Sequence, residues 1–267
     1  MADPPLTRHD VVLVRAANPG AFTLTGTNTW LIGRDPCWVV DPGPALAARV
    51  DAVLAQARLR GGVGGIALTH DHGDHAGAAE LLRARGGGPP VAAARWEGAD
   101  VRLRDGAGFG PLTVVATAGH APDHLAFVAG PVCFTGDAVL GSSSVFIAPD
   151  PGALRTYLAA LRTLRALRPA LLCPGHGPYV EQPDATLDGY LRHRLERERR
   201  LVAALAAGLR GVDELLDRVW DDAAPSLRAA ATATLAAHLD KLDEEGLLPA
   251  GVQRPAWPPP GGQAPVV

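Results

Sequence analysis

The chain has 267 residues, and its 47% hydrophobic and 20% charged residues are typical of a folded globular protein. A formal net charge of −3 argues against a protein that binds nucleic acid through bulk electrostatic attraction, although a local basic patch is compatible with it. No stretch approaches the roughly 20 uninterrupted apolar residues that a membrane-spanning helix needs, so no membrane partner is expected.

The cysteines and the start of the chain indicate a compartment. Cys37, Cys133 and Cys173 are widely spaced and form neither a CxxC pair nor a disulfide framework, which indicates a reducing environment. The first ten residues, MADPPLTRHD, are polar and lack the apolar segment of a secretion signal. We therefore expect a cytoplasmic protein, whose oligomeric state the sequence leaves open.

Between about Val11 and Cys173, short β-rich runs alternate with turns and a few helices. Helices are expected over Ala45–Leu59 and Ala76–Arg85, and a third carries an apolar stripe from Leu154 to Leu164. This pattern lacks an even βαβ rhythm and predicts an α/β fold in which helices cover the outer faces of sheets. The strands are expected at Val11–Val14, Thr29–Ile32, Trp38–Val40, Ile66–Thr69, Val91–Ala94, Leu112–Ala116, Leu125–Val128, Val132–Thr135 and Ala170–Cys173.

After Pro183 the pattern becomes helical. Three helices are expected, at Leu187–Leu209, Val212–Trp220 and Ser226–Glu245, and Gly246 is placed to end the last of them. We therefore predict an α/β domain of residues 1–183, a small helical domain of residues 184–250 and a proline-rich tail of residues 251–267.

The first of these helices is dense in arginine. Glu196 and Glu198 lie between the arginines, which favours a solvated helix with ion pairs along its surface. A face that follows the phosphates of a nucleic acid is the alternative. The arginines are Arg192, Arg194, Arg197, Arg199 and Arg200.

The segment Thr69-His70-Asp71-His72-Gly73-Asp74-His75 is the strongest chemical motif in the chain. Imidazole nitrogens and carboxylate oxygens are the donors that zinc, iron and manganese sites use. Residues two apart in an extended segment share a side, so His70 and His72 can bind one metal together. A turn at Gly73 would direct Asp74 and His75 towards a second point, so this loop can serve two metals.

Three further candidates each follow a predicted strand and a glycine. His120 stands in Ala-Gly-His, Asp137 in Thr-Gly-Asp and His176 in Pro-Gly-His. A tight turn at such a glycine can aim the next side chain back at a common site. Each is weak alone, but together with the histidine cluster they predict one metal centre.

The order H-x-H-x-D-H, then His, Asp and His, each after a strand, resembles the metallo-β-lactamase superfamily over roughly Val11 to Tyr179. The resemblance implies an αβ/βα sandwich with the site along one edge. It implies one metal held by His70, His72 and His120, and a second by Asp74, His75 and His176. Asp137 would bridge the two metals.

Within the superfamily, Thr27-Asn-Thr-Trp-Leu-Ile, Gly119-His-Ala-Pro-Asp-His124 and Ala236–Gly246 resemble the lactamase-β-like protein 2 group. That group carries a winged-helix-like domain after the catalytic one, which agrees with the predicted C-terminal helices. Asp74 and His124 are the candidate catalytic residues. His124 is expected to bond a substrate oxygen, with a capping role at the next strand as its alternative. Asn28 is as well suited to holding backbone turns as to contacting substrate.

The resemblance implies two divalent ions, zinc first and iron or manganese as alternatives. Metal coordination lowers the pKa of a bound water to about 7, so the expected activity is hydrolysis by a metal-bound hydroxide. An ester or thioester, small or carrier-bound, is favoured because Lys241 is the single lysine and aromatic residues are only 5%. The alternatives are an endoribonuclease on single-stranded RNA, a mononuclear iron persulfide dioxygenase and a non-catalytic binding module stabilised by metal.

Overall fold

The computed structural model describes residues 4–147 and 149–256. A short helix, α1 (Pro4–Arg8), precedes a six-stranded sheet in the order β1-β2-β3-β4-β5-β6. The first three strands pair antiparallel and the rest are parallel. The strands are β1 (Val11–Arg15), β2 (Asn28–Ile32), β3 (Cys37–Val40), β4 (Val63–Ala67), β5 (Val91–Ala93) and β6 (Val101–Arg102).

The second sheet has five strands in the order β11-β10-β9-β8-β7. Only the β10–β11 pair is parallel, because α5 (Ala153–Ala166) connects these two strands, whereas the others are joined by tight turns or, between β8 and β9, by a short loop. The strands are β7 (Gly108–Phe109), β8 (Leu112–Ala116), β9 (Leu125–Ala129), β10 (Val132–Gly136) and β11 (Leu171–Pro174).

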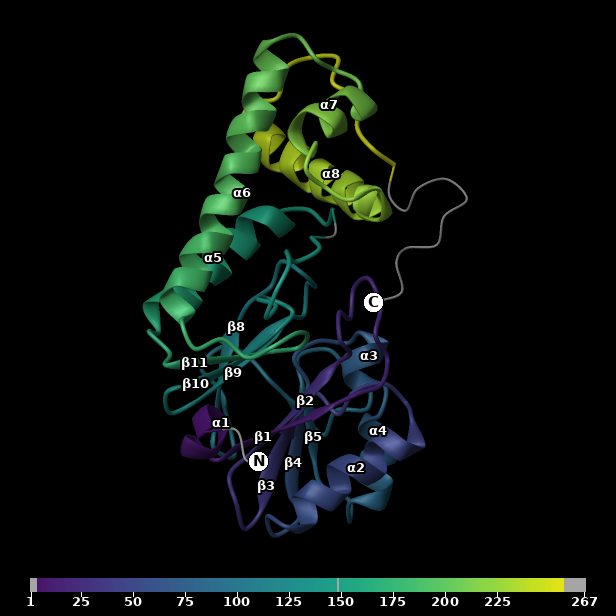
Figure 1. The fold of residues 1–267 in the computed structure, drawn as a ribbon, viewed down its shortest axis with the longest axis vertical. Coiled ribbons are helices and arrows are strands. Elements are labelled where there is room, and N and C mark those ends of the chain that lie inside the picture. Colours follow the sequence, from purple (N-terminus) through teal and green to yellow (C-terminus); the bar gives the residue numbers. More distant parts are fainter. Residues whose placement is uncertain (1–3, 148, 257–267) are drawn as a thin grey trace.

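The two sheets pack face to face, with helices on both outer sides (Figure 1). Trp30 and Val40 of the first sheet share a buried cluster with Phe127 and Phe134 of the second. The outer face of the first sheet is covered by α2 (Ala47–Arg58) and α4 (Ala79–Arg85), and that of the second by α5. The predicted αβ/βα sandwich is therefore confirmed.

Strand β4 lies about three residues earlier than predicted, at Val63–Ala67 and not at Ile66–Thr69. Gly64 and Gly65 hid its start because they carry no apolar signal. A Cβ on Gly65 would lie 2.6 Å from the Phe109 ring, so close packing between the sheets requires glycine there. The two-residue strands β6 and β7 were not predicted, since two residues show no periodicity.

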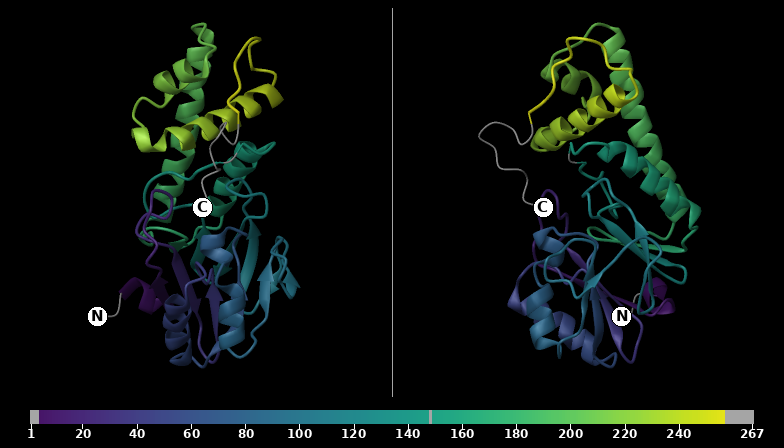
Figure 2. Two further views of the ribbon diagram at one scale, coloured as in Figure 1. Left: turned by 90° about the vertical axis from the view of Figure 1, so that its right-hand side faces the viewer. Right: turned by 180° about the vertical axis from the view of Figure 1, so that it is seen from behind.

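The C-terminal helices form a unit beside the sandwich (Figure 2). Leucines of three α-helices meet in its core, among them Leu201, Leu215 and Leu235. The predicted helical domain is thus present. Among the described residues after β11 the regular elements are all helical, so they contain no strands that could form a wing. The helices are α6 (Pro183–Ala206), α7 (Val212–Val219), the 3₁₀ helix Pro225–Leu227 and α8 (Arg228–Glu244).

Helix α6 packs against both parts of the molecule. Leu187 and Tyr190, near its start, are buried against the second sheet and α5, whereas Leu201 and Leu205 belong to the helical core. The division at residue 183 stays a prediction, with α6 shared between the two units. Residues 257–267 of the predicted tail lie outside the described residues. None of the described helices combines the length and hydropathy needed to cross a bilayer.

Candidate metal centre

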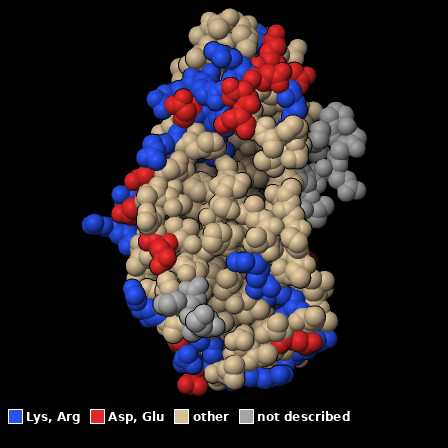
Figure 3. All heavy atoms as spheres, viewed as in Figure 1, with Lys and Arg blue, Asp and Glu red and all other residues tan. Residues whose placement is uncertain are grey.

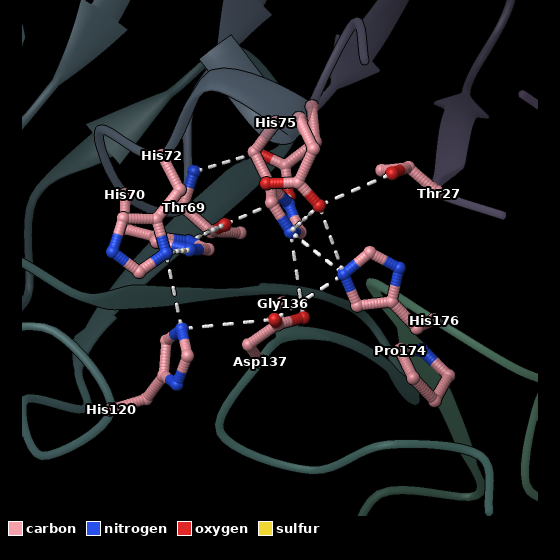
Figure 4. A network of polar contacts seen from close by, with 12 residues as sticks. Thr27, Thr69, His70, His72, His75, His120, Gly136, Asp137, Pro174 and His176 are labelled. Atoms are coloured by element: carbon pink, nitrogen blue, oxygen red, sulfur yellow. Dashed lines mark hydrogen bonds and ion pairs between the residues drawn. The ribbon is translucent and has the colours of Figure 1, made fainter. Parts of the chain in front are cut away.

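The ends of several strands bring the predicted ligands together at one edge of the sandwich (Figure 4). Loops after the carboxyl ends of β4, β8, β10 and β11 carry most of them, and the one-turn helix α3 (Gly73–Ala76) carries two more. Possible ligand atoms in each of three overlapping groups lie within 4.8 Å of one another. The groups are His70, His72 and His120; His70, His75 and Asp137; and Asp74, His75 and His176.

The first group is a triangle of imidazole nitrogens. Nδ1 of His72 lies 2.9 Å from Nε2 of His70 and 3.2 Å from Nε2 of His120. Outside the triangle, Nδ1 of His120 lies 2.9 Å from the carbonyl oxygen of Phe146. A carbonyl only accepts, so this Nδ1 carries the proton and the inner Nε2 presents its lone pair. Such a triangle of lone pairs suits a cation.

The second group combines imidazole with carboxylate. Nε2 of His176 lies 3.2 Å from Nε2 of His75 and 3.2 Å from Oδ2 of Asp74. Asp137 faces both groups, since its Oδ2 lies 3.3 Å from Nε2 of His176 and 3.7 Å from Nε2 of His120. Its position between the groups agrees with the bridging role that the sequence predicts.

Burial and neighbouring charges shift the pKa values of the two groups in different ways. Burial holds the pKa of His70 well below its ordinary value and lowers that of His72 to about 4, which keeps both rings neutral. Burial also lowers the pKa of His75, but Asp74 and Asp137 outweigh it and raise that pKa well above its ordinary value. Burial opposes ionisation of Asp137, yet His176 and His75 hold its pKa well below the usual range.

Two buried oxygens show that the donors fit metal ions. Within the described part of the chain, Oδ1 of Asp74 and Oδ1 of Asp137 have no hydrogen-bond partner. A buried carboxylate oxygen without a partner is destabilising, and a coordinated divalent cation would remove that penalty. The neutral rings of the first group and the two acids of the second therefore match a pair of divalent cations.

Asp41 is a buried carboxylate behind the ligands that the sequence analysis missed. Its Oδ1 accepts a hydrogen bond from the Thr69 amide, and its Oδ2 accepts one from the Thr69 hydroxyl, each at 2.8 Å. Oδ2 also lies 2.8 Å from Nδ1 of His75, and the Thr69 hydroxyl lies 2.9 Å from Nδ1 of His70. Asp41 thus orients one ligand of each group, a role that partners of metal-binding histidines commonly have.

One sequence signal points to Asp41. It follows strand β3 in Asp-Pro-Gly-Pro and adopts a positive φ of 53°, a conformation that aspartate tolerates better than most residues. In the sequence these residues directly follow the predicted strand Trp38–Val40 and by themselves indicate only a turn. Nothing local indicates that this carboxylate meets Thr69 and His75, which are far along the chain.

Two residues beside β2 support the second group. The Thr27 hydroxyl donates to Oδ2 of Asp74 at 3.3 Å. Nδ2 of Asn28 donates to the carbonyl oxygens of Pro174 and Gly177, at 3.0 and 2.8 Å, and so holds the loop that bears His176. Of the two readings of Asn28, the geometry favours the backbone role.

His124 lies next to Asp137 and both of its ring nitrogens have protein partners. Nδ1 lies 2.8 Å from the Thr117 hydroxyl, and Nε2 accepts the amide hydrogen of Asp137 at 3.0 Å. No lone pair or N–H is left for a substrate oxygen. The geometry favours a role in positioning Asp137 over the substrate contact that the sequence suggested.

Replacing His124 by alanine tests this role. The variant leaves the Asp137 amide without its acceptor, so we expect metal affinity to fall about 10-fold to 100-fold, the usual effect of losing a partner of a metal ligand. Competition with a chelator, followed by metal analysis, measures the affinity. Unchanged affinity with reduced turnover would instead indicate direct contact with substrate.

The arginine-rich helix is only partly solvated, which corrects the sequence interpretation. Arg199 pairs with Glu196 along the helix, as expected, whereas Arg200 pairs with Asp221, which follows α7. Arg194 and Arg197 are buried, because α6 presents them to the loop after β10 and to the end of α7. Helical spacing alone could not reveal that partners lie on both sides of α6.

A pocket extends from the metal donors towards the helical unit. His120 and Asp137 line it, and so do residues of α6 and α8. Phe22 and Phe146 pack edge to face on its wall, with ring centroids 6.2 Å apart. The pocket therefore joins the candidate metal centre to the C-terminal helices.

A family model described as the metallo-beta-lactamase superfamily matches residues 22–102 and 94–176, which together span more than half of the chain. The chain belongs to the metallo-beta-lactamase superfamily. Members of this superfamily are typically hydrolytic metalloenzymes that bind divalent metals, and the donors described above are in keeping with membership. The expected metal-dependent hydrolase is thus confirmed at this level.

Relatives refine the place of the chain within the superfamily. It is 28% identical over 261 residues to a Beta-lactamase-like protein 2 homolog of Caenorhabditis elegans, covering 89% of this chain and 85% of the relative. It is 33% identical over 208 residues to Thioesterase pkgB of Emericella nidulans, covering 74% of this chain and 59% of that protein. The predicted resemblance to the lactamase-β-like protein 2 group is confirmed.

A solved structure shows the same fold. A Beta-lactamase domain protein from Burkholderia ambifaria superposes with a TM-score of 0.76 at 21% identity, covering 89% of this chain and 86% of that one. The match includes most of the C-terminal helices as well as the sandwich, because it extends well past the residues that the family model matches.

Proposed function

We propose that this metallo-beta-lactamase superfamily member hydrolyses an ester or thioester whose acyl part lies in the pocket beside the metal centre. One observation carries the proposal: the pocket that begins at His120 and Asp137 is walled mainly by apolar side chains. Apolar walls favour a hydrocarbon chain, because its transfer out of water is stabilising. The thioesterase name of the Emericella nidulans relative supports the same substrate class.

Several parts of the chain contribute apolar side chains to these walls. The loop before β2 supplies Phe22 and Leu24, the loop after β10 supplies Val145 and the end of α7 supplies Trp220. An acyl chain between them would exclude water from the carbonyl group, which strengthens electrostatic interactions there.

The side chains of the site have two roles, binding of the metal ions and proton transfer. Two divalent cations, zinc first, would be held by the His70, His72 and His120 group and the Asp74, His75 and His176 group, with Asp137 between them. Bound there, they would polarise the scissile carbonyl and lower the pKa of water to about 7. The Asp74 carboxylate lies among these donors, with its Oδ2 held by the Thr27 hydroxyl, and can act as the proton acceptor for the attacking water.

The charge distribution weakens the RNA alternative. On the face shown in Figure 3, basic and acidic side chains are intermingled over the helical unit, and uncharged residues cover the middle of the molecule. Binding of single-stranded RNA requires a groove of basic residues along the backbone, usually with aromatic residues for stacking. Arg199, Arg200 and Arg228 are neutralised by ion pairs with acids, so they are poorly suited to binding the phosphates of an RNA backbone.

The experiment compares turnover of a neutral acyl thioester and of single-stranded RNA across a salt titration. We expect thioester hydrolysis that changes little with salt, because a neutral substrate releases no counterions. RNA affinity should instead fall with a log–log slope of about −0.7 for each phosphate contacted.

Three outcomes separate the candidate functions. Salt-sensitive RNA cleavage that His72→Ala abolishes, without thioester turnover, would overturn the proposal in favour of an endoribonuclease. A single bound iron with oxygen uptake on a persulfide would identify a dioxygenase. Full metal content without turnover of any of these substrates would identify a binding module.

A further inference from the structure

The pocket beside the metal donors is also lined by a buried cation. Arg194 of α6 lines the pocket with only 2% of its surface exposed. Trp220, Leu227 and Ala231 line the same pocket and are apolar. A positive charge in such surroundings is destabilising unless a negative group compensates it.

Among residues 4–147 and 149–256 no acid forms an ion pair with Arg194, because the nearby Asp222 and Glu198 pair with Arg197 and Lys241. Its Nη2 donates to Oγ of Ser144 at 3.1 Å and to the carbonyl oxygen of Val145. The guanidinium carbon lies 5.4 Å from the centroid of the Tyr157 ring. Nε is buried and has no hydrogen-bond partner among the residues that the structure describes, so these residues do not use the full hydrogen-bonding capacity of the guanidinium.

Arg197 lines the same pocket and provides the contrast. Its guanidinium bonds both carboxylate oxygens of Asp222, at 2.6 and 2.8 Å, and lies 5.7 Å from the Trp220 ring centroid. Asp222 therefore neutralises Arg197, whereas Arg194 leaves one uncompensated positive charge in the pocket.

Other ionisable groups around Arg194 do not change this balance. Burial and the neighbouring arginines lower the pKa of His193 to about 4, so this ring is neutral at physiological pH. Among the described residues that line the pocket, the one acid is Asp137, which lies among the metal donors. The pocket thus has donors for cations and a single uncompensated positive charge, with apolar walls.

We propose that Arg194 binds a carboxylate on the acyl part of the substrate, whose ester or thioester carbonyl lies at the metal centre. The inference rests on the proposed hydrolase function and names its substrate class, the monoesters and monothioesters of dicarboxylic acids. A carboxylate matches the planar guanidinium and carries the one negative charge that Arg194 requires. The Ser143 hydroxyl lines the same pocket and can donate a further hydrogen bond to the carboxylate.

The test uses matched substrates on the full-length, metal-loaded protein. N-acetylcysteamine monothioesters of succinate, glutarate and adipate are compared with thioesters in which a primary amide replaces the free carboxylate. Release of the thiol gives kcat/KM for each. We expect the wild-type protein to prefer one carboxylate over its amide by about tenfold to a hundredfold, the size expected for hydrogen bonds to a charged group.

Substitutions in α6 test whether Arg194 causes the preference for the acid over the amide. Arg194→Met should remove the discrimination between acid and amide, and Arg194→Lys should retain part of it. Arg199→Met is the matched control, because it removes an exposed cation from the same helix and should leave the discrimination unchanged. Thermal unfolding with glutarate or glutaramide gives a second measure, in which glutarate alone should stabilise the wild-type protein and not Arg194→Met.

The outcomes separate the inference from the function on which it rests. Equal hydrolysis of acid and amide by the wild-type protein, or a preference that survives in Arg194→Met, would overturn the carboxylate site and leave the hydrolase intact. Cleavage of RNA that depends on Arg194, without thioester turnover, would overturn both. If Arg194→Met does not fold, two other measurements test the carboxylate site. They are the acid-to-amide preference of Arg194→Lys and the stabilisation of the wild-type protein by glutarate.

Discussion

Replacing Asp137 by alanine should release at least one of two bound divalent ions and abolish hydrolysis. Its carboxylate lies between the two ligand groups, 3.3 Å from Nε2 of His176 and 3.7 Å from Nε2 of His120. We expect a loss greater than the 10-fold to 100-fold that follows from changing an outer partner of a ligand. Metal analysis of the purified variant, with kcat/KM on the same preparation, measures both effects.

Asp137→Asn is the matched comparison for this prediction. It keeps the size of the side chain and one carbonyl oxygen but removes the charge, so it should retain more metal than the alanine variant. Two bound ions and full turnover in Asp137→Ala would rule out the bridging role and place the second ion elsewhere.

Replacing Asp41 by asparagine should weaken both ligand groups at once, although Asp41 binds no metal itself. Its two oxygens face three donors, the Thr69 amide, the Thr69 hydroxyl and Nδ1 of His75. An amide has one acceptor oxygen, so at least one donor loses its partner, which costs about 1–3 kcal/mol in a buried position. We expect lower metal affinity together with a lower free energy of unfolding in the metal-free protein.

Chelator competition and denaturant unfolding check the Asp41 prediction. Asparagine tolerates the positive φ of residue 41, so backbone strain does not confuse the result. Asp71→Asn is the control, since Asp71 lies in the same histidine-rich segment but is exposed to solvent. If Asp41→Asn and Asp71→Asn behaved alike, the orienting role of Asp41 would be untenable.

The fold class and the candidate donor set could both be predicted from the sequence by itself. His70, His72, Asp74 and His75 stand within six residues, and spacing of that kind is a local property that needs no knowledge of packing. The strands that carry His120, Asp137 and His176 were predicted because each has a run of apolar or β-branched residues long enough to show a period. The structure brings all these ligands to one edge of the sandwich.

Only the tertiary structure decided what surrounds those ligands. From the sequence, Asp41 is only a turn residue after a strand. The pairing of β3 with β4 places its carboxylate against Thr69 and His75. From the sequence, His124 could have contacted substrate. In the structure its Nε2 accepts the amide hydrogen of Asp137 instead. Hydrogen bonds of this kind join residues far apart in the chain, so no local pattern encodes them.

The arginines of α6 show the same limit most clearly. Their spacing with glutamates is that of a solvated helix, and Arg199 agrees with it. Arg194 is buried because α6 packs against the loop after β10, about 50 residues earlier, while Arg197 meets Asp222 beyond α7. Whether an arginine faces solvent, an acid or a pocket depends on which elements cover its helix, and tertiary packing alone sets that.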